Sequence, residues 1–229
     1  MTRAPFAFVA FLWRRRTTAS GELQVICVRV GAEKTSNDAG NRRLKWIMEQ
    51  AKKRPTEAWL GRGIEQCGMG YVIVARFKAD GEAEAGVFLL DMKCLGVKDA
   101  FLSRLSGAEY QTRLVDQIRG HSGLDPISPA CARRLVEDAV AYGRRFGFEP
   151  HADFRMAQRV FGGINPAEAE RTFTFGDNGK PMYIQGPNDS PEFAAQVTAQ
   201  LLRHCGRDGF NFVLARGDML GSDEPEGRF

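Results

Sequence analysis

The side chains most capable of chemistry follow two β-rich runs at residues 70–78 and 87–95. Asp91, Lys93 and Cys94 stand together at the end of the second run. Alternate residues of a strand point to the same face, so Asp91 and Lys93 are expected to share one face. A carboxylate can hold Mg²⁺ and a lysine can balance the charge of a phosphate, so this pair is the candidate catalytic site.

The segment Asp91-Met92-Lys93 has the form D-x-K. Over residues 69–101 the chain resembles the PD-(D/E)xK nucleases, and the resemblance implies Mg²⁺ held by this acid and by a second acid on the preceding strand. Residues 75–77, Ala-Arg-Phe, stand where that second acid is expected. The acids that could replace it lie in the expected hairpin loop or upstream of it: Glu65, Asp80, Glu82 and Glu84.

A structural role for the same pair is the alternative. Asp91 and Lys93 would then pair with each other or face solvent on the outer face of the hairpin. If the pair is catalytic, Asp91→Asn should abolish Mg²⁺-dependent cleavage and leave the fold intact, because an exposed polar replacement has little effect on stability. If the pair is structural, the same change should leave any activity unaltered.

The cysteines and histidines are expected to be structural or surface residues. The chain has five cysteines and three histidines, with no Cys-x-x-Cys pair. A nucleophilic cysteine needs a base beside it, and no histidine is close to Cys94 in the sequence. This usage predicts reduced thiols, a cytoplasmic location and no metal site or cofactor, apart from Mg²⁺ under the nuclease interpretation. The positions are Cys27, Cys67, Cys94, Cys131 and Cys205, with His121, His151 and His204.

Basic residues are concentrated in the first quarter of the chain. Residues 1–60 contain 12 Lys and Arg against 5 Asp and Glu, a net charge of +7, whereas the other 169 residues have a net charge of −3. Arginine contacts phosphates and aromatic rings stack on bases, so basic residues interleaved with Phe11, Trp13 and Trp46 predict a nucleic-acid-binding face. A solvated basic surface would have the same composition. The candidate residues are Arg14, Arg15, Arg16, Arg42, Arg43 and Lys45.

No membrane segment is expected. Residues 5–13 are apolar, but a membrane helix needs about 20 apolar residues. Three arginines follow this run, whereas a secretory signal has its positive charge in front.

Hydrophobic spacing and turn residues predict hairpins that alternate with helices. The clearest element is a helix that begins after Ser128 and Pro129 and ends at Gly147. Strands are expected at residues 5–13, 22–30, 70–78, 87–95, 172–175, 182–184 and 210–214. Helices are expected at residues 42–53, 108–119, 129–146, 153–161 and 191–205, the last capped by Asp189 or Ser190.

The fold class that follows is α+β, with antiparallel β-hairpins alternating with helices and a C-terminal ββαβ unit. Residues 1–163 are expected to form an α+β domain that carries the basic N-terminal hairpin and the central hairpin. Residues 164–216 are expected to form the ββαβ segment, packed on the same core. Residues 217–229 are expected to be a flexible acidic tail.

The first functional interpretation is a cytoplasmic binding or accessory module. Its basic N-terminal face would meet an anionic partner, which would be DNA or RNA. Two alternatives stay open: a Mg²⁺-dependent nuclease centred on Asp91 and Lys93, and a non-catalytic adaptor whose basic face meets an acidic protein.

Overall fold

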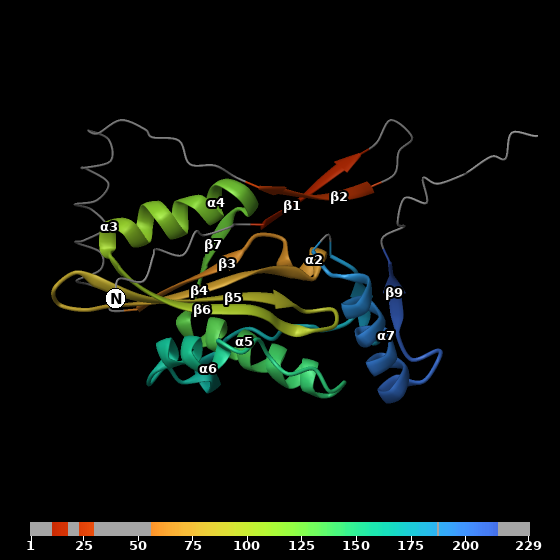
Figure 1. Ribbon diagram of the computed structural model, residues 1–229. Helices are drawn as coiled ribbons and strands as arrows, with labels where there is room; N and C mark the ends of the chain where they lie inside the picture. Colours follow the sequence, from red (N-terminus) through yellow and green to blue (C-terminus); the bar gives the residue numbers. More distant parts are fainter. Residues whose placement is uncertain (1–10, 18–22, 30–55, 187, 215–229) are drawn as a thin grey trace, which may run out of the picture.

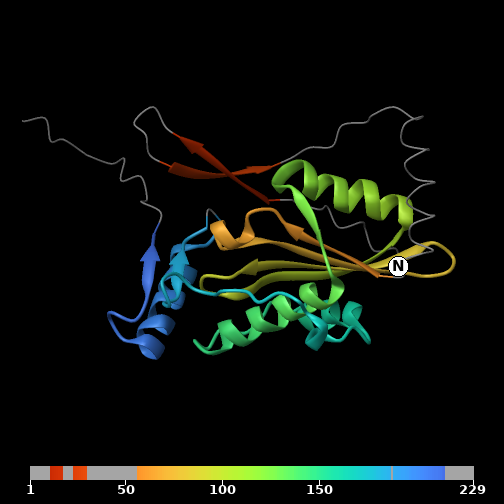
Figure 2. The same cartoon turned by 180° about the vertical axis from the view of Figure 1, so that it is seen from behind.

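The computed structural model describes residues 11–17, 23–29, 56–186 and 188–214. Its centre is a five-stranded antiparallel sheet with the strand order β6-β5-β4-β3-β7 (Figure 1). The strands are β3 (Thr56–Gly61), β4 (Met69–Phe77), β5 (Glu82–Asp91), β6 (Gly96–Ser106) and β7 (Leu124–Ile127). Helices cover both faces of this sheet, as the view from behind also shows (Figure 2). The predicted α+β class is confirmed.

The central strands are buried on both faces. In β4, Val72 and Val74 face one helical layer and Ile73 and Ala75 face the other, and all four side chains are fully buried. Alternate residues of a strand point to opposite faces, so a strand between two layers needs apolar residues at successive positions. This requirement explains the continuous apolar run that predicted β4 from the sequence.

The turn between β4 and β5 is shorter than the sequence suggested. The backbone N–H of Lys78 donates to the carbonyl oxygen of Glu82 at 2.8 Å, which closes the hairpin. Glu82 and Glu84 therefore lie in β5 and not in a loop, and Glu84 pairs in register with Arg76. The expectation that these acids occupy the hairpin loop is wrong, because the antiparallel ladder continues to the turn.

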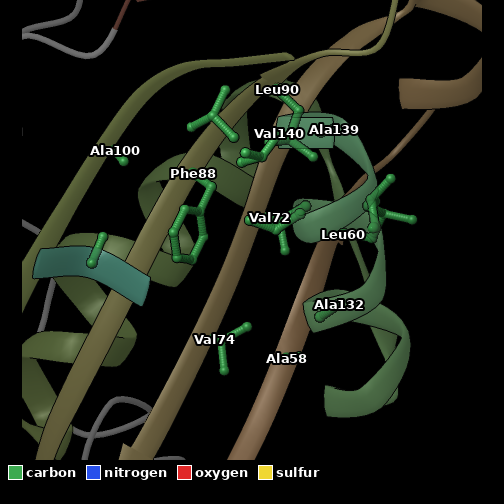
Figure 3. Packing of buried hydrophobic residues seen from close by; sticks show 14 of the residues in the cluster. Ala58, Leu60, Val72, Val74, Phe88, Leu90, Ala100, Ala132, Ala139 and Val140 are labelled. Atoms are coloured by element: carbon green, nitrogen blue, oxygen red, sulfur yellow. The ribbon is translucent and has the colours of Figure 1, made fainter. Parts of the chain in front are cut away.

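One face of the sheet is covered by α5 (Pro129–Arg144), α6 (Phe154–Ala157) and the 3₁₀ turn η2 (Gln158–Phe161). The predicted cap of α5 is confirmed, because the Ser128 hydroxyl accepts from the backbone N–H of Cys131 at 3.1 Å. The buried residues on this face form one cluster (Figure 3), in which Phe88 of β5 stacks against Phe161.

Glycines allow α5 to approach the start of β6 closely. A Cβ on Gly96 would collide with the carbonyl oxygen of Ala139, and Gly96 has a φ of +75°. A Cβ on Gly143 would lie 2.7 Å from the carbonyl oxygen of Leu95. Helix and strand therefore meet backbone to backbone here, which fixes the position of the turn between β5 and β6.

The opposite face is covered by one nearly continuous helical segment, α3 (Gly107–Glu109), η1 (Tyr110–Val115) and α4 (Asp116–Ser122). Its middle part, η1, is a π-helix. This helical segment packs on alternate positions of β4 and β5. The buried residues that it contributes are Tyr110, Leu114, Val115 and Ile118.

The C-terminal unit consists of η3 (Pro166–Glu168), β8 (Met182–Ile184), α7 (Pro191–Cys205) and β9 (Asn211–Val213). β8 and β9 pair in parallel across α7, and Ser190 caps α7 by accepting from the N–H of Phe193. Residues 172–175 do not form a strand. The turn predicted beside them is closed by a single bridge between Asp177 and Lys180.

A separate two-stranded ribbon is formed by β1 (Phe11–Thr17) and β2 (Leu23–Arg29). The sequence suggested that residues 14–17 belong to the connection between the strands, whereas the structure places them inside β1. β1 lies against α4.

The sequence did not predict β3, β6 and β7, whose hydrophobic alternation is weaker. β6 is an edge strand of the sheet and contains charged residues. The helix predicted at residues 42–53 and the tail predicted at 217–229 lie outside the described residues. Within the part of the chain that the structure covers, no helix is long and apolar enough to cross a membrane.

Candidate functional site

Asp91 is the last residue of β5, and its side chain holds the turn that leads into β6. Its Oδ1 accepts hydrogen bonds from the backbone N–H of Lys93 at 2.9 Å and of Cys94 at 3.0 Å. Asp91 is only 4% exposed. The outward, solvent-facing position considered for Asp91 is therefore wrong, because the carboxylate folds back onto its own turn.

Burial raises the pKa of the Asp91 carboxyl, because the charged form is poorly solvated there. The N–H groups of Cys94, Lys93 and Leu95 and the charge of Lys98 act in the opposite direction. A buried acceptor that satisfies two backbone donors supports the fold, because those donors would otherwise be unpaired.

Lys93 lies in the turn, where its side chain turns away from Asp91. Its Nζ is 3.8 Å from Oδ1 of Asp177, and its carbonyl oxygen accepts from the N–H of Met182 at 2.9 Å. The lysine stem lies over Gly68, where a Cβ would be 2.6 Å from Lys93 Cδ. The structure thus places Asp91 and Lys93 at one turn but gives the two charged groups different partners.

A second polar cluster lies beside this turn. Lys98 is an extra residue at a β-bulge, since Leu90 pairs with Val97 and Leu89 pairs with Asp99. A bulge redirects a side chain, and here the Lys98 Nζ meets Asp189, 3.0 Å from Oδ1.

The Asp189 carboxylate is almost buried and has three donors. Its side chain is 8% exposed, and its Oδ2 accepts from Lys98 Nζ at 3.0 Å, from Tyr183 Oη at 3.1 Å and from the N–H of Gly186 at 2.8 Å. Together with the bond between Lys93 and Met182, this cluster attaches the C-terminal unit to the turn. Sequence reasoning considered Asp189 only as a helix cap, a role that Ser190 has instead.

Cys94 is fully buried, and burial is the main reason that its pKa is raised. It packs with Leu95, Tyr183 and Leu201 in an apolar cluster. A thiol with a raised pKa is a poor nucleophile, so this environment supports the structural role that the sequence favoured.

The acids considered as second metal ligands have other partners. Glu82 pairs with Lys78, Glu84 with Arg104 and Glu65 with Arg171. The fourth candidate, Asp80, accepts from the backbone N–H of Glu82. Among the residues that the structure describes, no group of three or more His, Cys, Asp and Glu is arranged to hold a metal ion.

The histidines lie in three separate parts of the chain. His121 is in α4, His204 is near the end of α7, and His151 lies before α6 with its Nδ1 3.6 Å from Oδ1 of Asp99. His204 Nε2 is 3.4 Å from Nε2 of Gln200.

The predicted nucleic-acid-binding residues are covered only in part. Arg14, Arg15 and Arg16 pair in register with Ile26, Val25 and Gln24 of β2. The remaining three candidates, Arg42, Arg43 and Lys45, lie outside the described residues.

The sequence did not single out three exposed arginines on or beside α6 and η2. The Arg76 guanidinium lies against Gly162, Arg155 is in α6, and Arg159 is in η2. Within the described ranges, none of them is in an ion pair with a carboxylate. Spacing along the chain gives no signal for this group, because β4 and η2 are brought together only by folding.

Comparisons with protein-family models, with curated proteins and with solved structures find no match for this chain.

Proposed function

We propose that this protein is a cytoplasmic, non-catalytic nucleic-acid-binding module that uses the β1–β2 ribbon as its contact surface. The observation that carries the proposal is the run of three consecutive arginines inside β1, in a ribbon separate from the five-stranded sheet. A two-stranded ribbon is one of the two elements that fit the major groove of B-DNA. Arginine is the side chain best suited to phosphate and to guanine edges.

The turn from Asp91 to Leu95, together with the Lys98–Asp189 pair beside it, is called the hairpin exit, and it supports a binding role over the nuclease alternative. Asp91, the acid that the D-x-K pattern would use for Mg²⁺, already accepts two backbone hydrogen bonds in a buried position. Lys93 has its own carboxylate partner in Asp177. Both groups are therefore engaged in holding the turn and the C-terminal unit.

The cysteines support the proposed cytoplasmic location. Cys94, Cys131 and Cys205 are free thiols, as expected in a reducing compartment.

The test is a salt titration of binding to a short fluorescent duplex and to its single strand. Affinity should fall with salt, with a log–log slope of about −0.9 per phosphate contacted on the duplex and about −0.7 on the single strand. Replacing Arg14, Arg15 and Arg16 by Gln should flatten this slope.

Replacing the same three arginines by Lys is the matched control, because it keeps the charge and should keep most of the slope. If the wild-type protein binds neither duplex nor single strand at low salt, the proposal is overturned. If it cuts either one in a Mg²⁺-dependent manner that Asp91→Asn abolishes, the nuclease alternative replaces it.

A further inference from the structure

We infer that the exposed face of α6 and η2 is a second surface that contacts the sugar–phosphate backbone of nucleic acid. We call it the α6 arginine surface, and it consists of Arg76, Arg155 and Arg159. The inference rests on the proposed function, since the same polymer would be the ligand.

The first step is that folding brings β4 and η2 together at this place. The guanidinium of Arg76 lies against the backbone of Gly162, where a Cβ would be 2.7 Å from Nη1. The N–H of Gly162 in turn donates to the carbonyl oxygen of Arg159 at 3.2 Å. Gly162 has a φ of +47°, and glycine is the residue that both tolerates this conformation and leaves room for the guanidinium.

The second step is that the two helical arginines point outward. Ala157, Val160 and Phe161 are buried against the sheet, so Arg155 and Arg159 lie on the opposite, exposed side. Arg155 belongs to α6 and Arg159 to the 3₁₀ turn that follows it, and both are exposed.

The third step is that these arginines have no carboxylate partner within the described part of the protein. Eight arginines elsewhere in the described chain have a carboxylate within ion-pair distance, namely Arg62, Arg104, Arg113, Arg119, Arg133, Arg134, Arg144 and Arg171. Across the residues placed by the structure, the three members of the α6 arginine surface have no such partner. An arginine without a partner gives up no ion pair when it binds an anion.

The carboxylate that faces Arg76 across the sheet is engaged by another arginine. In the register of the sheet Arg76 pairs with Glu84, and Glu84 pairs with Arg104, whose Nε lies 3.2 Å from Glu84 Oε1. Glu84 is therefore already paired with Arg104, and Arg76 makes no ion pair with it.

Exposed guanidinium groups that have no carboxylate partner in the described structure fit a polymer of phosphates. Each guanidinium can donate two parallel hydrogen bonds to one phosphate. Gly163 has open space on its side-chain side, and Met156, 46% exposed, offers an apolar contact beside Arg155. In such a polymer the phosphates supply the anions, and the sugars supply carbon-bound edges for the apolar contact.

The α6 arginine surface and the ribbon lie on opposite sides of the sheet. β1 lies against α4, which covers one face, whereas α6 covers the other, and both views show this separation (Figures 1 and 2). The two surfaces therefore contact different segments of nucleic acid, and the protein can bridge them.

The test compares two triple variants with the same reduction in charge. The first is Arg76→Gln/Arg155→Gln/Arg159→Gln. The matched control removes three arginines that have carboxylate partners, Arg134→Gln/Arg144→Gln/Arg171→Gln. Binding to the short duplex is measured by anisotropy between about 50 and 200 mM salt, and bridging by energy transfer between two differently labelled duplexes.

The first variant should bind about tenfold more weakly and should no longer bridge two duplexes. Its salt slope should be shallower by about 0.9 for each phosphate that its side chains cease to bind. The control should retain most of its affinity and its bridging. Arg155→Gln alone should show a smaller shift in the same direction, and it serves if the triple variant is poorly folded.

Four outcomes overturn the inference. Equal reductions in the two triple variants would show a general charge effect. A first variant with wild-type affinity, slope and bridging would overturn the α6 arginine surface and leave the ribbon in place. A first variant that no longer binds poly-glutamate but still binds duplex would assign the surface to an acidic protein. A wild-type protein that binds no nucleic acid would overturn both this inference and the proposed function.

Discussion

The hairpin exit and the α6 arginine surface are both rich in charge, yet they differ in where that charge finds its partners. At the exit, Asp91 and Asp189 are nearly buried, and each accepts several hydrogen bonds from the protein itself. On the α6 arginine surface, exposed guanidinium groups have no carboxylate partner among the described residues. Charge with internal partners builds the fold, and charge without them is available to a ligand.

The physical reason is desolvation. A buried charge gives up its hydration and must regain that free energy from fixed donors or an opposite charge. An exposed arginine keeps its water until an anion replaces it, so it adds little to stability. Replacements in the two regions should therefore affect different measurements.

The largest effect is expected where a charge is placed in the core with no partner at all. Val136 of α5 is fully buried against the sheet. Val136→Asp should lower the free energy of unfolding by several kcal/mol, because an unpaired carboxylate is costly to bury. Thermal unfolding measures this decrease, and Val136→Ala, expected to cost about 2 kcal/mol, is the control for the reduced volume. Equal decreases in the two variants would contradict the argument.

Next in size is the separation of Lys98 from Asp189. Asp189→Ala should cost about 3–5 kcal/mol, because it leaves the ammonium of Lys98 nearly buried without its counter-charge. Denaturant unfolding gives the value. The double variant Lys98→Met/Asp189→Leu should recover much of this stability, since it removes both charges. A double variant less stable than Asp189→Ala would show that the two groups do not act as a pair.

A smaller effect is expected at Asp91. Asp91→Ala removes the acceptor of two backbone hydrogen bonds and should cost about 1–3 kcal/mol. Asp91→Asn retains a carbonyl oxygen and should cost less. The two variants are compared by thermal unfolding at neutral pH, and an unchanged melting temperature for Asp91→Ala would place Asp91 with the exposed charges instead.

The pH dependence sharpens the same comparison. The pKa of Asp91 is raised above its ordinary value in the folded protein, chiefly by burial. The folded state therefore takes up this proton before the unfolded state does, and the contribution of Asp91 to stability rises as the pH falls through the folded-state pKa. Relative to Asp91→Asn, which does not titrate, wild-type protein should gain stability between neutral pH and about pH 4. A relative decrease over this window would contradict the burial argument.

The smallest effect is expected on the α6 arginine surface. Arg155→Gln and Arg159→Gln should each change the free energy of unfolding by less than about 0.5 kcal/mol, because the side chains are exposed and make no ion pair in the described structure. The same variants are expected to weaken binding to nucleic acid. A clear drop in stability would reveal an internal role for these arginines and would remove the contrast with the hairpin exit.

Local patterns predicted the elements whose signals are local. The N-cap at Ser128, Pro129 at the first helical position and a regular apolar stripe were sufficient for α5. The run of apolar residues on both faces of the strand was sufficient to predict β4. β6 was missed because its bulge at Lys98 interrupts the alternation and its outer positions are polar, as edge strands often are.

The sequence predicted where the candidate site lies but not the hydrogen bonds that Asp91 accepts there. The sequence brought Asp91 and Lys93 to one turn, and an aspartate that caps the N–H two residues later is a known turn signal, which would have suggested its structural role. The partner of Lys98 lies 91 residues away in sequence, and no local pattern indicates such a contact. The α6 arginine surface could not be predicted either, since it depends on which arginines lack a partner after folding.

The C-terminal unit, which covers Cys94, is translated last, and this has a consequence for the order in which the protein folds during synthesis. All five strands of the central sheet have been translated by residue 127 and α5 by residue 144, whereas the residues that cover Cys94 and Leu95 come from α7 and from Phe210. We expect that a nascent chain can fold its sheet while the Cys94 thiol is still open to reagents, and that the thiol becomes protected as β8, α7 and Phe210 are added. Thiol labelling of stalled nascent chains of increasing length would follow this step directly.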